Sequence, residues 1–217
     1  MGFLSWFRRR PVLPVAVWID AESQREGLVG DVVADRDRGV SSIVVAHFEA
    51  ALVQAGQDLA AAGVVFTTLP TWTEATTQRL VGGGGGGEVV LTLARALPEA
   101  AAATVGAAAA RSRPCSVRLV ELHVLAAANE RLRTFAAALP GPAVVEAATS
   151  FDDPVMREFA SPAVQRMMSA LGLKPGEAIR SPMVSRAVAR ALAKLERRVG
   201  ADRPAASLGE WLQHNLR

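Results

Sequence analysis

The chain has 217 residues, and 50% of them are hydrophobic, so it is long enough to bury one sizeable core. Its formal net charge of +3 is too small to indicate a nucleic-acid-binding protein. A single cysteine, Cys115, excludes a disulfide framework within the chain and is typical of proteins from a reducing compartment. No apolar run is long enough to span a bilayer as a helix.

The first residues combine apolar and basic side chains. The members of this group are Phe3, Trp6, Arg8, Arg9 and Arg10. Their order is not that of a signal peptide, in which the charges precede the apolar stretch. Contact with an anionic membrane surface is one interpretation. A terminus that frays or packs on the core is the alternative, and the shortness of the segment favours it. We assign residues 1–14 to a basic and apolar tail.

Short apolar runs alternate with helical patterns along the first two thirds of the chain. The runs predict strands at residues 15–19, 42–46, 64–67, 89–93, 117–124 and 143–147. Between them, apolar residues at helical spacing predict helices at residues 22–36, 49–62, 74–80, 98–110 and 129–139. Strands that alternate with helices in this way are typical of a parallel sheet covered on both faces. The predicted fold class is therefore α/β.

The last third of the chain predicts helices only. Capping signals precede them at Asp152-Asp153-Pro154, Ser161-Pro162, Ser181-Pro182 and Ser207. Glu210 completes a capping box with Ser207. The helix that begins after Ser181 is expected to continue to residue 199. Its polar face, opposite an apolar stripe, carries Arg186, Arg190, Lys194 and Arg197.

The order of uncommon pieces in residues 150–198 resembles the SecA preprotein translocase ATPase family. The pieces are DDPVMREFAS, MMSALGLKPGEAI and SPMVSRAVARALAKLERR. In SecA a similar run lies where the second nucleotide-binding domain meets the helical scaffold, and upstream the order of elements agrees. The resemblance implies a RecA-like domain, like the C-terminal lobe of helicases, over residues 15–150. It also implies a helical, scaffold-like extension over residues 151–217.

The motifs that hydrolyse ATP in that family are missing from this sequence. No Walker A loop, G-x-x-x-x-G-K-(S/T), occurs. Where SecA has a glycine- and arginine-containing loop at a strand end, only Thr92 and Arg95 remain as candidates for nucleotide contact. The second arginine run is replaced by residues 135–142, and we expect Arg131 upstream of it to face solvent. ATP is the cofactor that the resemblance implies, but the loss of these motifs predicts neither bound ATP nor ATPase activity from this chain alone.

Other candidate sites have simpler explanations. Six consecutive glycines, Gly82 to Gly87, precede a strand and not a helix, so they predict a flexible loop and not a phosphate cradle. His47, His123 and His214 are far apart in the sequence and lack the spacing of metal ligands. Cys115 follows a proline in a predicted loop and is expected to be an ordinary thiol. We predict no catalytic residue and no metal site.

Three functions remain as hypotheses. The first, which we favour, is a non-catalytic SecA-like interaction factor of protein export. It would be cytoplasmic or peripheral to the inner membrane, and would dock on the full-length SecA ATPase or the translocon through Arg186, Arg190 and Arg197. The second is a subunit of a split SecA-type ATPase, in which Arg95 acts across a joint site. The third is a free-standing interaction module with no export role.

Overall fold

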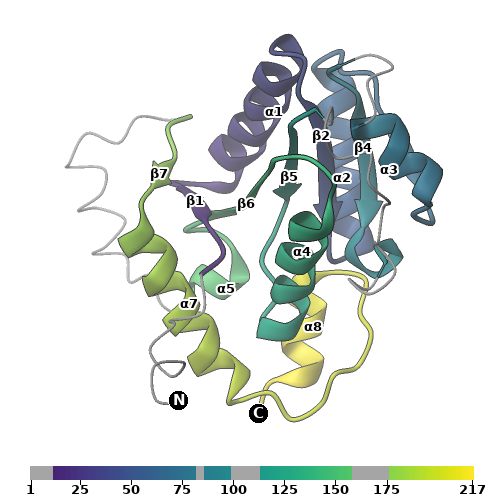
Figure 1. The fold of residues 1–217 in the computed structure, drawn as a ribbon. Helices are drawn as coiled ribbons and strands as arrows, with labels where there is room; N and C mark the ends of the chain where they lie inside the picture. The colour runs from purple at the N-terminus through teal and green to yellow at the C-terminus, as the bar shows by residue number, and fades with distance from the viewer. Residues whose placement is uncertain (1–11, 82–85, 99–112, 158–175) are drawn as a thin grey trace, which may run out of the picture.

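One seven-stranded sheet runs through the computed structural model, which describes residues 12–81, 86–98, 113–157 and 176–217 (Figure 1). The strand order is β3-β4-β2-β5-β6-β1-β7. The strands are β1 (Val15–Trp18), β2 (Ser41–Ala46), β3 (Thr67–Leu69), β4 (Val89–Leu93), β5 (Cys115–Leu119), β6 (Ala143–Ser150) and β7 (Ile179–Arg180). All neighbouring strands pair in parallel except β7, which is antiparallel to β1. The predicted α/β class is therefore confirmed, and the arrangement is consistent with a RecA-like lobe.

Helices cover both faces of this sheet. One face packs against α1 (Ala21–Asp37) and α2 (Glu49–Ala61). The other face packs against α3 (Glu74–Val81), α4 (Ala126–Ala138), α5 (Pro154–Arg157), α7 (Pro182–Glu196) and α8 (Leu208–Asn215). A short 3₁₀ turn, η1 (Ala94–Ala96), follows β4. Because residues of α7 and α8 share one apolar cluster with the sheet, the C-terminal helices are part of the same core.

Three strand boundaries differ from the prediction for physical reasons. The β3 strand begins at Thr67 and not at Val64, because Val64 is buried beside the helices whereas Val65 is 88% exposed. The apolar run at 117–124 is a strand only to Leu119, and residues 120–124 continue as a buried loop. Cys115 is the buried first residue of β5 and not a loop residue. Burial raises the pKa of its thiol to about 11, which makes it a poor nucleophile.

Four further elements differ in extent or existence. The β6 strand continues to Ser150, three residues past its predicted end at residue 147, and α7 ends at Glu196 and not at residue 199. The α4 helix begins at Ala126, three residues before the predicted start at Asn129. The β7 strand was not predicted, because its two residues give no periodic signal. The helix predicted at residues 98–110 lies outside the described residues apart from Pro98, and so does the helix predicted to begin at Ser161-Pro162.

Helix caps follow the predicted chemistry with two reassignments. Ser181 accepts a hydrogen bond from the Met183 amide, and Ser207 accepts one from the Glu210 amide, so both predicted caps are confirmed. The Glu210 carboxylate accepts the Ala206 amide in place of the Ser207 amide that the predicted capping box requires. Asp153 caps α5 by accepting the Val155 amide at 2.8 Å. Asp152 instead accepts the Ala21 amide at the start of α1, at 3.3 Å. The acidic pair therefore joins two helix starts that lie 131 positions apart in the sequence.

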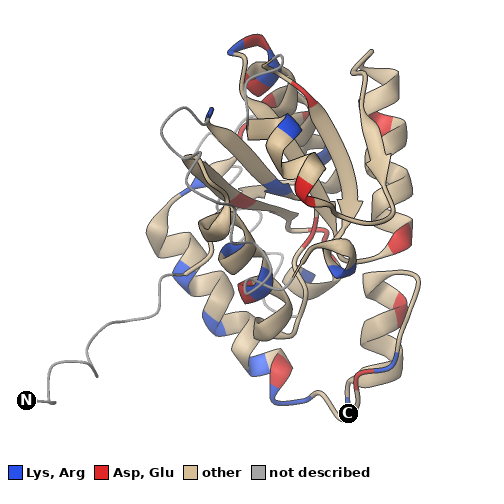
Figure 2. Ribbon diagram, turned by 45° about the vertical axis from the view of Figure 1, so that its right-hand side comes forward, with Lys and Arg blue, Asp and Glu red and all other residues tan. Residues whose placement is uncertain are grey.

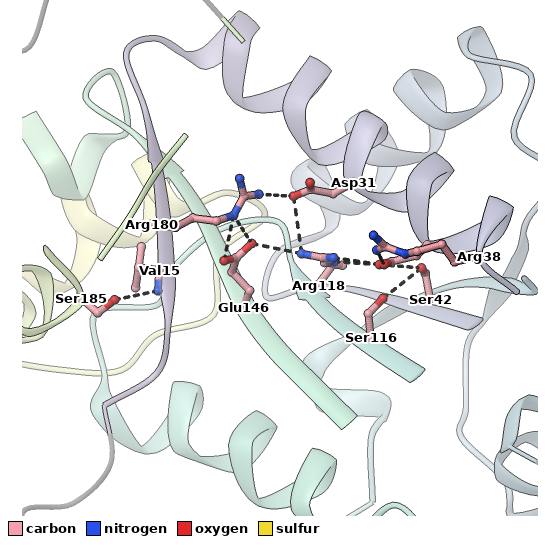
Figure 3. A network of polar contacts seen from close by, with 10 residues as sticks. Val15, Asp31, Arg38, Ser42, Ser116, Arg118, Glu146, Arg180 and Ser185 are labelled. Atoms are coloured by element: carbon pink, nitrogen blue, oxygen red, sulfur yellow. Dashed lines mark hydrogen bonds and ion pairs between the residues drawn. The ribbon is translucent and has the colours of Figure 1, made fainter. Parts of the chain in front are cut away.

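A buried ionic network fastens α1 to the middle of the sheet (Figure 3). Arg118 on β5 is 11% exposed and donates to Asp35 of α1 at 2.9 Å and to Glu146 of β6 at 3.1 Å. Asp31 of α1 also contacts Arg118, at 3.5 Å. Arg180 of β7 extends the network by pairing with Glu146 and Asp31. Because the acids come from α1 and β6, Arg118 joins three elements through one side chain.

Gly27 in the middle of α1 allows Trp18 to pack directly against the helix backbone. A Cβ atom at this position would lie 2.2 Å from Trp18 Nε1, and Trp18 is 1% exposed, so the ring has no room to move. We expect Gly27→Ala to lower the free energy of unfolding in urea by about 1–3 kcal/mol through overpacking. Gly30→Ala is the matched control in the same helix, because its Cβ would meet nothing within 4 Å. The control should raise stability by up to about 1 kcal/mol, and equal effects at both positions would contradict this interpretation.

Candidate functional site

The carboxyl ends of β2 and β5 form the topological switch point of the sheet. The connection after β2 leads to α2 on one face, and the connection after β5 leads to α4 on the other face. Parallel α/β sheets usually bind ligands in such a crevice. Here the chain fills it, because Glu121 Oε1 accepts the amides of His47 at 3.2 Å and Phe48 at 3.0 Å. These amides directly precede α2, whose N-cap is Phe48, so an internal carboxyl group occupies a position beside the helix start where an external anion could bind.

The chemistry of Glu121 follows from this position. Burial raises the pKa of its carboxyl to about 8, although the amides of Phe48 and His47 act in the opposite direction. The nearby Asp153 raises the pKa further, and burial raises that of Asp153 itself to about 6. At neutral pH Glu121 is therefore mostly protonated. A phosphate group has no place at the start of α2 while Glu121 remains bound there.

His47 follows β2 and His123 follows β5, and hydrogen bonds and burial keep both imidazoles neutral. His47 Nε2 donates to Asn129 Oδ1 at 3.2 Å, since the amide nitrogen of Asn129 already donates to the carbonyl of His123. His123 Nδ1 accepts the Leu125 amide at 3.0 Å, so its proton lies on Nε2. Burial, together with the neighbouring His123, lowers the pKa of His47 to about 3, and burial also lowers that of His123. The pair is thus brought together by the fold, but as a packed structural unit.

The C-terminal helix covers this pair. The Trp211 ring of α8 packs edge-on against His123 with centroids 4.8 Å apart, and Phe48 stacks on the same imidazole at 5.4 Å. Trp211 is 1% exposed and its Nε1 donates to Asp202. No group of three or more His, Cys, Asp or Glu suited to a metal ion occurs within the described ranges. This side of the strand ends is therefore filled by the protein itself.

The two candidates for nucleotide contact both have partners within the protein. Thr92 is fully buried on β4, and its hydroxyl donates to the Leu69 carbonyl at 2.9 Å. Arg95 in η1 is 65% exposed and pairs with Glu49 at 2.6 Å. Arg131, expected to face solvent, instead donates to the Leu97 carbonyl at 2.6 Å, so that expectation is wrong. The geometry at Thr92 and Arg95 requires no ligand to explain it.

A basic face runs along the outside of α7 (Figure 2). We call it the α7 basic face, and its members are Arg186, Arg190, Lys194 and Arg197. All four side chains are exposed, and none has an acidic partner within the part of the chain that the structure describes. The first three follow one another at intervals of four residues, so they share one side of the helix. The predicted interaction arginines are thus brought together on one continuous surface.

An apolar groove of about 460 Å³ lies between α4 and α7, and we call it the α4–α7 groove. Its lining includes Val12, Leu122, Ala126, Val188, Ala189, Leu192 and Ala193. The polar side chains in it are committed elsewhere: Ser185 accepts the Val15 amide, Asn129 binds His123, and Glu130 pairs with Arg133. Ala189 and Ala193 each stand three residues after an arginine of the basic face. The groove and the basic face therefore share an edge.

Two predicted features remain outside or at the margin of the described chain. Phe3, Trp6, Arg8, Arg9 and Arg10, the proposed membrane-contact residues, lie outside the described residues. So do the first four residues of the glycine run. Gly87 is described, and its positive φ of 85° brings it against the end of α1, where a Cβ would lie 2.8 Å from the Arg36 carbonyl oxygen. This glycine is required by packing.

A search against models of known protein families finds no match for this chain. None of the described helices is both long and apolar enough to cross a membrane. What the site can bind is therefore inferred from the positions of its own residues.

Sequence reasoning missed the α4–α7 groove, whose walls come from residues about 60 positions apart. The alanines next to the arginines of α7 were the available signal, because small residues at that spacing leave room beside a helix.

Proposed function

We propose that this protein is a non-catalytic docking module that binds an acidic, partly apolar segment of another protein. The apolar side of that segment would fill the α4–α7 groove, and its carboxylates would pair with the α7 basic face. The observation that supports this most directly is the shared edge between four exposed cations without acidic partners in the described structure and a groove lined by alanine, valine and leucine. Charge at the rim and apolar surface at the centre is the usual composition of a protein interface.

The resemblance of residues 150–198 to SecA directs the choice of partner. That range includes the whole of α7, so the basic face lies on the most SecA-like part of the chain. We therefore propose the full-length SecA ATPase or the translocon as the partner, and an accessory role in protein export. The absence of a Walker A loop from the sequence, and the internal bonds of Thr92 and Arg95, support a binding role over an ATPase role.

Charge reversal on α7 tests this proposal. In a binding assay with purified full-length SecA or translocon, Arg186→Glu combined with Arg190→Glu should raise Kd about tenfold or more, since two attractive contacts become repulsive. Arg186→Lys combined with Arg190→Lys is the matched control, because it keeps both charges, and Kd should stay within about threefold. Binding of the unmodified protein should weaken with added salt.

The groove needs its own variant, because charge alone would not distinguish docking from nonspecific attraction. Ala193→Gln places a larger, polar but uncharged side chain on the groove edge without touching the buried side of α7 or changing the charge of the basic face. It should weaken binding if the groove holds the apolar side of the partner. If neither purified partner binds, the export assignment is wrong. If a partner binds and charge reversal leaves Kd unchanged, the α7 basic face is not the docking surface. Binding that is unchanged in Ala193→Gln would exclude the groove while keeping the basic face.

A further inference from the structure

A second cavity, of about 230 Å³, lies on the opposite face of the sheet from the α4–α7 groove. Its walls are the first two turns of α1, one side of α2 from Ala51 to Asp58, and the residues at the ends of β5 and β6. This is the side of the strand ends that α8 does not cover. The cavity is independent of the docking surface, and none of the residues assigned above to the α7 basic face lines it.

The lining of this cavity is strongly acidic. Its charged members are Arg25, Asp58, Glu121, Asp152 and Asp153. They come from every element around the cavity: Arg25 from α1, Asp58 from α2, Glu121 from the loop after β5, and the two aspartates from the turn after β6. Four carboxyl groups and one guanidinium therefore line the cavity. Each carboxyl group already accepts a hydrogen bond from within the protein, but its two oxygens leave further acceptor capacity. That remaining capacity favours a ligand that carries positive charge and several N–H donors.

A buried hydroxyl at the base of the cavity lacks a partner. Ser150 ends β6, is fully buried and lines the cavity, and its Oγ has no hydrogen bond within the described structure. Side chains two residues apart in a strand point to the same face, so Ser150 points to the same side as Ala148, which packs with α1 and α2. Buried polar groups without a partner are rare, and of those in the described structure Ser150 is the one that lines this cavity, where a ligand or a water molecule could bond to it. This observation is independent of the acidic lining.

We propose that the cavity binds a guanidinium group, supplied either by a small free molecule or by an arginine side chain of a peptide. A guanidinium is planar and presents five N–H donors, so it can bridge the Ser150 hydroxyl and carboxylates from more than one wall. A single ammonium offers fewer donors in a less fixed geometry. The size of the cavity suits such a head group with a short alkyl chain.

The acidic groups make this binding depend on pH. The pKa of Glu121 is raised to about 8 and that of Asp153 to about 6, in both cases chiefly by burial. A bound cation favours the ionised carboxylates, so binding releases protons. Affinity should therefore rise from pH 6 to pH 8, by roughly fivefold or more. An uncharged ligand would not show this rise.

Calorimetric titration of the full chain with propylguanidinium tests the proposal. We expect a Kd of about 1 mM or tighter at pH 8. Propylurea, which has a similar shape but no charge, should not bind, and tetramethylammonium, which has charge but no N–H donor, should bind at least about tenfold more weakly. Titration with a short arginine-containing peptide amide distinguishes the two sources of the guanidinium group, an arginine side chain and a free small molecule. Affinity at least equal to that of propylguanidinium supports an arginine side chain, and failure of the peptide alone supports a free small molecule.

Ser150→Ala is the decisive variant, because it removes a hydroxyl that has no partner in the described structure. Without ligand its thermal midpoint should be equal to or higher than that of the unmodified protein, so a folding defect will not confuse the result. Its affinity for propylguanidinium should fall about tenfold. Glu22→Gln, an exposed acid of α1 outside the cavity, is the control and should change nothing. Equal binding by Ser150→Ala, equal binding of propylurea, or no binding at 10 mM (about ten times the expected Kd) would each overturn the proposal.

Discussion

Replacement of Arg118 by methionine should lower the free energy of unfolding by about 3–5 kcal/mol, because it leaves a buried carboxylate without its main partner. The side chain of Asp35 is 4% exposed, and Arg118 approaches it through Nε at 3.2 Å and through Nη2 at 2.9 Å. Burial alone would raise the pKa of Asp35. The hydrogen bonds of Ser116 and Arg118 and the positive charge of Arg118 overcome this effect and lower the pKa below 3.8. Urea denaturation at pH 7 measures the loss.

The same network contains a matched comparison. Arg180 binds two of the same acids, Glu146 and Asp31, but its side chain is 43% exposed where that of Arg118 is 11% exposed. Arg180→Met should therefore cost no more than about 1 kcal/mol, since solvent screens an exposed ion pair. Similar losses at the two arginines would show that burial does not decide the strength of this network (Figure 3).

A compensating variant separates the buried charge from the packing of the arginine stem. If the ionised Asp35 causes the loss, adding Asp35→Asn to Arg118→Met should recover a large part of it. No recovery would mean that the loss comes from the packing of the arginine side chain or from its contacts with Glu146 and Asp31, and not from Asp35. The lowered pKa of Asp35 adds a pH test. Its contribution is present above pH 3.8 and is lost as the pH falls through the lower pKa of the folded state.

How far the sequence predicts this fold depends on the range over which each signal acts. The β-branched run Ile43 to Val45 predicts a strand because a central parallel strand is apolar on both faces, and it is fully buried. The apolar run at residues 117–124 predicts a strand that is too long, because burial also makes the following loop apolar. An apolar segment continues past Leu119 because the loop is also buried, and periodicity cannot distinguish a buried strand from a buried loop. That loop carries Glu121 and His123, so the misplaced boundary concealed the filled switch point.

The candidate sites also differ in how far apart their residues lie in the sequence, and this decides which of them could be predicted. The α7 basic face was predictable, because Arg186, Arg190 and Arg197 belong to one helix and helical spacing places them together. The acidic cavity was not, since Asp58, Glu121 and Ser150 come from three elements and meet only through the sheet topology. Glu121 has no neighbour in the sequence that identifies it as buried. Its role depends on the amides of His47 and Phe48, which are more than 70 positions away.

Replacement of Glu121 by glutamine should make the protein more stable, and increasingly so as the pH rises. The pKa of Glu121 is about 4.5 in an unfolded chain and about 8 in the folded protein, mainly through burial. Between these values the folded state holds a proton that the unfolded state has released, so stability falls as the pH rises towards 8. Glutamine keeps an oxygen for the amides of His47 and Phe48 but does not titrate. At pH 8 we expect a gain on the order of 4 kcal/mol, and at pH 5 a gain below about 1 kcal/mol.

Measuring both proteins at the same pH removes the contribution of the histidines. The pKa of His47 is about 3 in the folded state, so each protein becomes less stable as the pH falls below 6.5. This loss is the same in both proteins and cancels in the comparison. Urea unfolding at pH 5, 6.5 and 8 therefore isolates the carboxyl. Glu121→Ala should be less stable than Glu121→Gln at every pH, because two amides beside the start of α2 lose their acceptor. A gain for glutamine that does not change with pH would show that Glu121 does not hold its proton in the folded protein.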